Sequence, residues 1–176
     1  SKRGRYYVND HFLRFYYRFI VPQLSAIERG YQEAAAAKIQ AELRSFLGTH
    51  VFEELCRDWV WVAAMSGQLD FVPEEVGSYW RRYRGKGVQL DVFAAAPRDK
   101  RLLIGEAKWG RQPLRRNILT DLVQRSQRMP QVAEGWQTQY VLFAREGFTD
   151  ALQEYAHSLD ALLISLDQIE GTLLEA

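Results

Sequence analysis

The chain has 176 residues, of which 47% are hydrophobic, and its 23 Lys and Arg against 22 Asp and Glu give a net charge of +1. This length predicts one globular domain, with room for an extra segment at one end, and the near-zero charge excludes a bulk attraction to nucleic acid or anionic membrane. The single cysteine, Cys56, excludes an internal disulfide and a CxxC zinc site. No apolar run approaches the roughly 20 residues of a bilayer span, so we expect a soluble, cytoplasmic protein.

The first 65 residues show the apolar spacing of helices. The first expected helix is amphipathic, has Asp10 or Asn9 as its N-cap and ends near Pro22. An alanine-rich run then predicts a second helix, and Gly48-Thr49 either separates it from a third or kinks one long helix. The expected helical stretches are residues 9–20, 32–47 and about 50–65.

Short apolar runs bounded by turn residues follow Gly67 and predict strands. The first of them should pair as antiparallel hairpins. Helices are expected at 113–129 and 150–157, and the second of these favours a parallel crossover between the last two strands. The fold class is therefore α/β: a mixed β-sheet flanked by helices on both faces, with an N-terminal accessory helical segment. The expected strands are residues 69–72, 76–80, 88–95, 102–108, 139–143 and 162–166.

Ionisable residues interrupt two of these strands where the alternation of apolar residues expects core. The segments read VQLDVFA, with Asp91, and LLIGEAKW, with Glu106 and Lys108. Pairing through the turn near residues 97–100 places Asp91 opposite Glu106, and opposed carboxylates repel one another unless a positive group lies between them. A divalent cation would supply that charge.

The same residues predict a hydrolytic site. Lys108 follows Glu106 by two positions and so lies on the same face of the strand. Two carboxylates and the carbonyl of Ala107 suffice for Mg²⁺ or Mn²⁺, which retain several waters, and Lys108 would hold or deprotonate the attacking water. Asp91→Ala is then expected to keep or slightly raise stability in the absence of metal, whereas a structural salt-bridge cluster, the alternative for these residues, would lose stability.

Asp91 followed by Glu106-Ala107-Lys108 resembles the D…(D/E)xK signature of the PD-(D/E)xK, or restriction-endonuclease-like, nucleases. In that superfamily the preceding helix often supplies another glutamate in a setting such as Gly-x-x-x-Phe-Glu, and residues 48–53 read GTHVFE. The resemblance implies that Glu53 has this role, in preference to Glu54. The implied catalytic residues are Glu53, Asp91, Glu106 and Lys108, with Asp91, Glu106 and Ala107 as metal ligands.

A second resemblance covers nearly the whole chain. The runs YYVNDHFLRFYYRFIVPQLSAIERG, GTHVFEELCRD, VGSYW, LDVFA and GEAKW are similar to the C-terminal portion of the archaeal-type AAA ATPases. In that family a P-loop ATPase leads through a winged-helix segment into a nuclease-like domain. The resemblance implies that residues 1–30 are the tail of the winged-helix segment and residues 31–176 the nuclease-like domain. The chain has no G-x-x-x-x-G-K-[ST], so the ATPase would be a partner outside these residues.

Two functions compete on this basis. The first is a Mg²⁺- or Mn²⁺-dependent DNA nuclease module, and the second is a DNA- or protein-binding module of the ATPase that does not cleave. A homodimer is possible in either case, and no membrane is expected as a partner. DNA would contact local clusters of arginine, whose alternative is ordinary surface solvation. The candidates for phosphate contacts are Arg81, Arg82, Arg84, Arg111, Arg115 and Arg116, and Arg125 and Arg128 belong to the same basic cluster near the site as the last three.

Overall fold

The computed structural model describes residues 10–83 and 85–175, and it divides into two compact units at Val51 and Phe52. The predicted boundary at residue 30, between the tail of a winged-helix segment and a nuclease-like domain, stays a prediction. None of the helices in the described residues is long and apolar enough to cross a membrane. Each unit is described below by itself.

The described part of the first unit is entirely helical, as expected for the accessory segment. Asp10 is the N-cap of its first helix, accepting a hydrogen bond from the Leu13 N–H at 2.8 Å. The chain then runs through a π-helical turn at Tyr16–Ile20 and a 3₁₀ turn at Val21–Gln23. The α-helices are α1 (His11–Phe15), α2 (Leu24–Glu28) and α3 (Gln32–Phe46), and a second π-helical turn, Leu47–Val51, follows α3.

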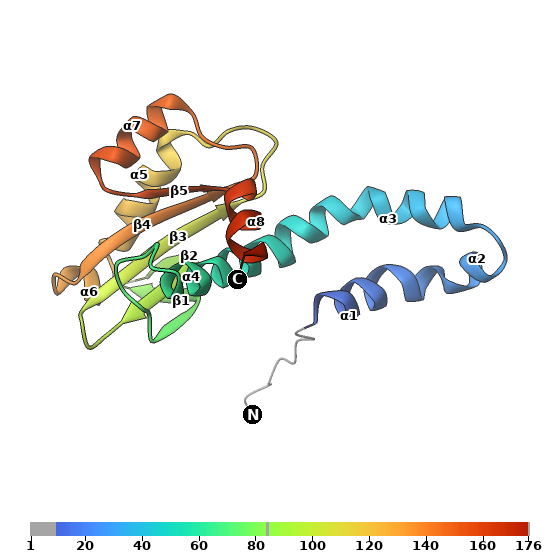
Figure 1. Cartoon of the computed structure of the whole chain (residues 1–176), viewed down its shortest axis with the longest axis horizontal. Helices are drawn as coiled ribbons and strands as arrows, with labels where there is room; N and C mark the ends of the chain where they lie inside the picture. Colours follow the sequence, from blue (N-terminus) through green and yellow to red (C-terminus); the bar gives the residue numbers. More distant parts are fainter. Residues whose placement is uncertain (1–9, 84, 176) are drawn as a thin grey trace. The chain divides into compact units, whose positions relative to one another are not determined.

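The prediction that Pro22 ends the first helix was wrong. Pro22 lies in the first turn of the 3₁₀ segment, where a missing N–H and a fixed φ are tolerated, and α2 follows it directly. The turn at Gly30 then brings the aromatic stripe onto α3, where the Phe19 and Phe46 rings meet edge to face with centroids 5.2 Å apart. The unit is thus a helical hairpin (Figure 1).

The second unit contains all five strands of the described chain. They form one sheet in the order β1-β2-β3-β4-β5, with β1, β2 and β3 antiparallel and β3, β4 and β5 parallel. The mixed sheet and the parallel crossover between its last two strands are therefore confirmed, and β3 and β4 form a second parallel pair. The strands are β1 (Glu75–Tyr83), β2 (Lys86–Ala96), β3 (Arg101–Lys108), β4 (Gln137–Ala144) and β5 (Leu162–Ser165).

Helices cover both faces of this sheet (Figure 1). On one face, α4 and α8 contribute Trp59 and Ile169 to a core that also includes Val92 of β2. On the other, α5 and α7 bury Leu119 and Leu152 in a separate core. The helices of this unit are α4 (Phe52–Met65), α5 (Arg116–Ser126), α6 (Pro130–Ala133), α7 (Asp150–Ser158) and α8 (Leu166–Leu174).

One predicted strand of this unit is absent, and the last one is a residue shorter than expected. Residues 69–72 form bends instead of a strand, although Leu69 and Phe71 are buried as the alternation required. Arg101 holds this segment through the carbonyl and carboxylate of Asp70 and lies over the Phe71 ring, so a side chain replaces a strand ladder. The last expected strand ends at Ser165 because that residue caps α8, a helix that was not predicted.

Candidate active site

A β-bulge re-aims the chain at Asp91. Gly77 pairs with Phe93 and Tyr79 pairs with Leu90, so Asp91 and Val92 together oppose the single residue between Gly77 and Tyr79. Leu90 and Phe93 consequently face the same core, and Val92 faces the other. Bulges disrupt the ladder locally and turn side chains to new directions. The carboxylate of Asp91 is placed by this irregularity, beyond the last regular pair of β2 with β3, Val92 with Gly105.

The Asp91 carboxylate hydrogen-bonds to β3 where the regular backbone pairing of β2 with β3 has ended. Its Oδ2 accepts a hydrogen bond from the buried Ala107 N–H at 3.0 Å. The Asp91 carbonyl accepts from Nη1 of Arg57, on α4, at 2.8 Å. Both the backbone and the side chain of the bulged residue are therefore held in position, because buried polar groups need such partners.

Glu106 and Lys108 lie on β3 beside this carboxylate, as predicted. The Lys108 ammonium is 2.5 Å from Glu106 Oε1 and 3.7 Å from Asp91 Oδ2, so it bridges the two carboxylates. The Glu106 and Asp91 side chains are only 10% and 11% exposed, and carboxylates so buried need compensating charge. The structure thus brings three of the four predicted catalytic side chains into one cluster.

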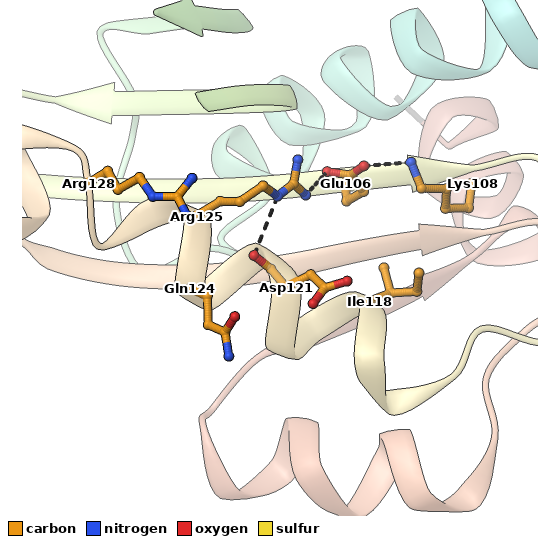
Figure 2. Close-up of a pocket in the computed structure, with 7 residues that line it drawn as sticks. All are labelled: Glu106, Lys108, Ile118, Asp121, Gln124, Arg125 and Arg128. Carbon is orange, nitrogen blue, oxygen red and sulfur yellow. Dashed lines mark hydrogen bonds and ion pairs between the residues drawn. The ribbon is translucent and has the colours of Figure 1, made fainter. Parts of the chain in front are cut away.

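Arg125 of α5 completes the neutralisation of Glu106 from the other side. Its Nη2 is 2.6 Å from Glu106 Oε2, and its Nη1 donates to the Gln89 carbonyl of β2 at 2.9 Å. Figure 2 shows the Glu106 carboxylate between the Lys108 ammonium and the Arg125 guanidinium. These cations line a pocket of about 360 Å³, whose walls are Glu106, Lys108, Ile118, Asp121, Gln124, Arg125 and Arg128.

Glu53 approaches the cluster from α4 and lies at its edge. Its carboxylate is 3.8 Å from Nη1 of Arg57, one helical turn further along, and its side chain is 36% exposed. Burial and the Asp91 carboxylate raise the pKa of Glu53, against the influence of Arg57 and Lys108. The Glu53 carboxylate therefore interacts electrostatically with Asp91 and Lys108, two of the residues with which the resemblance groups it.

Burial also raises the pKa of Asp91 above its usual value of 3.8, and the nearby Glu106 carboxylate adds to the effect. The Ala107 N–H, Lys108 and Arg125 act in the opposite direction. Two carboxylates sharing a partly buried site disfavour each other's charge, and perturbed groups of this kind are common at functional sites. A bound cation would remove the penalty.

The donor set suits a hard divalent cation. Asp91, Glu106 and the Ala107 carbonyl offer oxygen ligands, and the bridging ammonium of Lys108 marks a place where positive charge is favourable. Within the described residues no three His, Cys, Asp or Glu side chains are arranged to hold a metal. The residues fit Mg²⁺ or Mn²⁺ with two carboxylates and water, provided that Lys108 and Arg125 move away from Glu106.

The arginines predicted to contact phosphate lie on two separate segments. Arg81 and Arg82 are on β1, and Arg82 lies over the exposed Trp80 ring at 6.0 Å. Arg111 and Arg115 are in the segment after β3, and Arg116 opens α5 and stacks on Tyr155. Arg84 lies outside the described residues.

Arg57 was not among the predicted residues, and Arg125 was predicted only as a member of a basic cluster near the site, not as a partner of Glu106. Arg57 follows Glu53 by four positions on α4, a spacing that pairs opposite charges on one helix face and could have found it. Arg125 follows the buried Leu122 by three positions, but helical spacing alone cannot show that a long side chain reaches β3.

Comparison with known proteins places the chain in a family. Over 109 residues it is 37% identical to an uncharacterized protein of Methanocaldococcus jannaschii, a match covering 62% of this chain but only 23% of that protein. No solved structure matches it. Residues 16–122 match the family DUF234, described as archaeal and bacterial proteins of unknown function, and this range includes Glu53, Asp91, Glu106 and Lys108. The chain therefore belongs to the DUF234 family.

Proposed function

We propose that the second unit hydrolyses phosphodiester bonds of DNA with Mg²⁺ or Mn²⁺, as an endonuclease- or exonuclease-like module. The observation that supports this most is the convergence of Asp91, Glu106 and Lys108, in which an ammonium bridges two nearly buried carboxylates beside an open pocket. The resemblance of these residues to the PD-(D/E)xK signature points to the same chemistry.

Each residue has a distinct task in this proposal. Asp91 and Glu106 hold the cation with the Ala107 carbonyl, and the bulge keeps Asp91 turned toward Glu106. The cation, when bound, lowers the pKa of water and stabilises negative charge on a phosphodiester. Lys108 orients the attacking water as an ammonium, and it accepts the proton of that water only after releasing its own to solvent. Glu53 modulates the charge of the site from α4. Arginines around the site contact the DNA backbone without reading its sequence.

One observation favours a second candidate, a DNA- or protein-binding module without cleavage. Both oxygens of Glu106 already have cationic partners, Lys108 and Arg125, so the cluster is neutralised without a metal. A domain that uses this cluster only as a structural core would show the same contacts.

The wider context is also a proposal. The relative's much greater length and the resemblance to archaeal-type AAA ATPases support an attached P-loop ATPase as partner in a cytoplasmic protein. DNA is the other proposed partner, and a homodimer is compatible with both.

A cleavage assay tests the first candidate against the second. Wild type with millimolar Mg²⁺ or Mn²⁺ is incubated with single-stranded, duplex and branched DNA, with chelator as the blank. We expect divalent-dependent cleavage that Glu106→Gln abolishes, and that Lys108→Ala slows by about 100-fold or more, the usual size of a proton-transfer contribution. In chelator, the DNA affinity of Glu106→Gln should not fall, because this substitution removes a negative charge from the pocket.

Asp99→Asn is the matched control, because Asp99 is an exposed carboxylate in the turn at the opposite end of the β2–β3 hairpin. It should cleave like wild type. A wild type that gains no thermal stability from either ion and cuts none of the three substrates would leave only the binding module.

A further inference from the structure

Arg125 connects the Glu106 carboxylate to the pocket on α5. Three contacts hold its guanidinium: Glu106 Oε2 at 2.6 Å, the Gln89 carbonyl at 2.9 Å and the Asp121 carbonyl at 3.4 Å. A guanidinium has five N–H groups in a planar fork, so these contacts leave donors for a ligand. Its side chain is 29% exposed and lines the pocket directly.

The pocket has the chemistry of a phosphate site. Lys108, Arg125 and Arg128 contribute three positive charges to its walls, against the carboxylates of Glu106 and Asp121, and Gln124 adds an amide. Figure 2 shows these cationic groups, with Lys108 on β3, Arg125 on α5 and Arg128 in the turn that follows α5. Arginine forks bind phosphate oxygens in pairs, and a pocket of this size admits a backbone phosphate group of a nucleic acid.

Charge balance shows why the two ligands would depend on each other. Three acids (Glu53, Asp91 and Glu106) and three cations (Arg57, Lys108 and Arg125) make the cluster neutral. A divalent cation entering alone must displace Arg125 from Glu106 and leaves that guanidinium without its carboxylate. A phosphodiester in the pocket gives Arg125 a new anionic partner and frees Glu106.

We propose that Arg125 is a positioning residue that couples the two sites: it binds the phosphodiester in the α5 pocket when Glu106 takes the divalent cation. The inference rests on the proposed function, because it requires a cation at Glu106. Coupling is reciprocal, so the phosphodiester raises the affinity for the cation by the same factor as the cation raises that for the phosphodiester.

The test measures two affinities separately. Mn²⁺ affinity is obtained from thermal-shift titration, and nucleic-acid affinity from fluorescence anisotropy of a single-stranded oligonucleotide with hydrolysis-resistant phosphorothioate linkages. For wild type we expect the oligonucleotide to raise Mn²⁺ affinity about 5-fold or more. Arg125→Ala should bind Mn²⁺ more tightly without oligonucleotide, because a competing cation is gone. In saturating Mn²⁺ its oligonucleotide affinity should fall roughly tenfold, with a salt dependence shallower by about one phosphate contact, and the fall should be smaller in chelator, where Glu106 already holds Arg125 in wild type.

Three further variants separate coupling from folding. Arg125→Lys keeps the charge but not the fork, so its Mn²⁺ affinity should stay near wild type while its oligonucleotide affinity lies between those of wild type and Arg125→Ala. Arg128→Ala should lower the affinity for the oligonucleotide and leave the affinity for Mn²⁺ unchanged. Arg98→Ala, an exposed arginine in the turn at the far end of β2 and β3, should change neither.

Opposite changes in the two affinities of Arg125→Ala distinguish coupling from a structural role. If both affinities fall together with the melting temperature, or if neither changes, the coupling is wrong. If wild type binds Mn²⁺ and cleaves DNA, and Arg125→Ala has the same two affinities as wild type, the coupling is overturned and the proposed function is not. A wild type that binds no Mn²⁺ overturns both the coupling and the proposed function.

Discussion

At the scale of single residues, Asp91 has two tasks that different substitutions separate. Its Oδ2 partners the buried Ala107 N–H, and its charge repels Glu106. Removal of the side chain in Asp91→Ala leaves that N–H without a partner, which costs about 1–3 kcal/mol. The structure therefore revises the expectation that this variant keeps its stability. Asparagine keeps an acceptor oxygen and removes only the charge.

Asp91→Asn should raise the melting temperature above that of wild type in chelator, whereas Asp91→Ala should lower it. The gain depends on pH. Because the pKa of Asp91 is raised in the fold, its ionisation lowers stability as pH rises from 3.8 through the folded pKa. The advantage of Asp91→Asn should thus be full above that pKa and vanish near pH 3.8. Thermal melts across this range measure it, and a lower melting temperature for Asp91→Asn at pH 8 would favour a structural salt-bridge cluster.

The sequence was sufficient to find Asp91, Glu106 and Lys108 because all three interrupt apolar strands. It placed Arg125 only in a basic cluster near the site and did not show its contact with Glu106, because Arg125 lies on the flank of α5 between the buried Leu122 and Ser126. A residue at such a position is predicted to be exposed to solvent. Only the packing of α5 against β3 determines that the guanidinium of Arg125 reaches Glu106.

At the scale of secondary structure elements, the hairpin of β2 and β3 was predictable and its bulge was not. The turn at Pro97–Lys100 sets the register, and the observed pairs Val92–Gly105 and Phe93–Ile104 follow the prediction. The bulge depends on how β1 pairs with the other edge of β2, which no local pattern in VQLDVFA reveals. The apolar pattern of that segment is that of a regular strand, and it does not show that two residues of β2 oppose a single residue of β1.

Helix α8 shows a signal that was present but unused. Ser165 and Gln168 form a capping box, in which each side chain bonds the other residue's N–H, and this spacing is readable in the sequence. A hydrogen bond from the Trp59 indole N–H to Thr172 Oγ1, at 3.1 Å, joins α8 to α4.

Gly105, which directly precedes Glu106, is where three strands approach most closely. A Cβ there would lie 2.7 Å from Val141 Cγ1 and 3.0 Å from Val92 Cβ, distances that real contacts do not allow without movement. Gly105→Ala should therefore destabilise the fold by about 1–3 kcal/mol and displace Glu106. Urea denaturation measures the change.

The matched control is Gly171→Ala on α8, where the space around the glycine is open. It should stabilise by up to about 1 kcal/mol through helix propensity. If Gly105→Ala unfolds at the same urea concentration as wild type, the strands are not packed as tightly as the distances indicate.

At the scale of the whole molecule, the sheet has a core that is complete without the first unit. Every buried residue of the two core clusters comes from Phe52 or later, and α4 supplies one face of the sheet with its own large side chains. Unit one instead buries Phe19 against Phe46. The sequence predicted an N-terminal helical segment apart from the sheet, and in the structure the helical first unit extends to Val51.

We therefore expect a fragment of residues 47–176 to fold alone. Circular dichroism should show a single cooperative thermal transition, and Mn²⁺ should raise its melting temperature as it does for the full chain, since Glu53, Asp91, Glu106 and Lys108 are all retained. A fragment of residues 67–176 is the control: it lacks α4, and with it Phe52, Cys56, Trp59 and Val60 of the core, so it should not fold cooperatively. A longer fragment that is unfolded at 25 °C would mean that residues 10–46 complete the core, and the site would then depend on the helical hairpin for its stability.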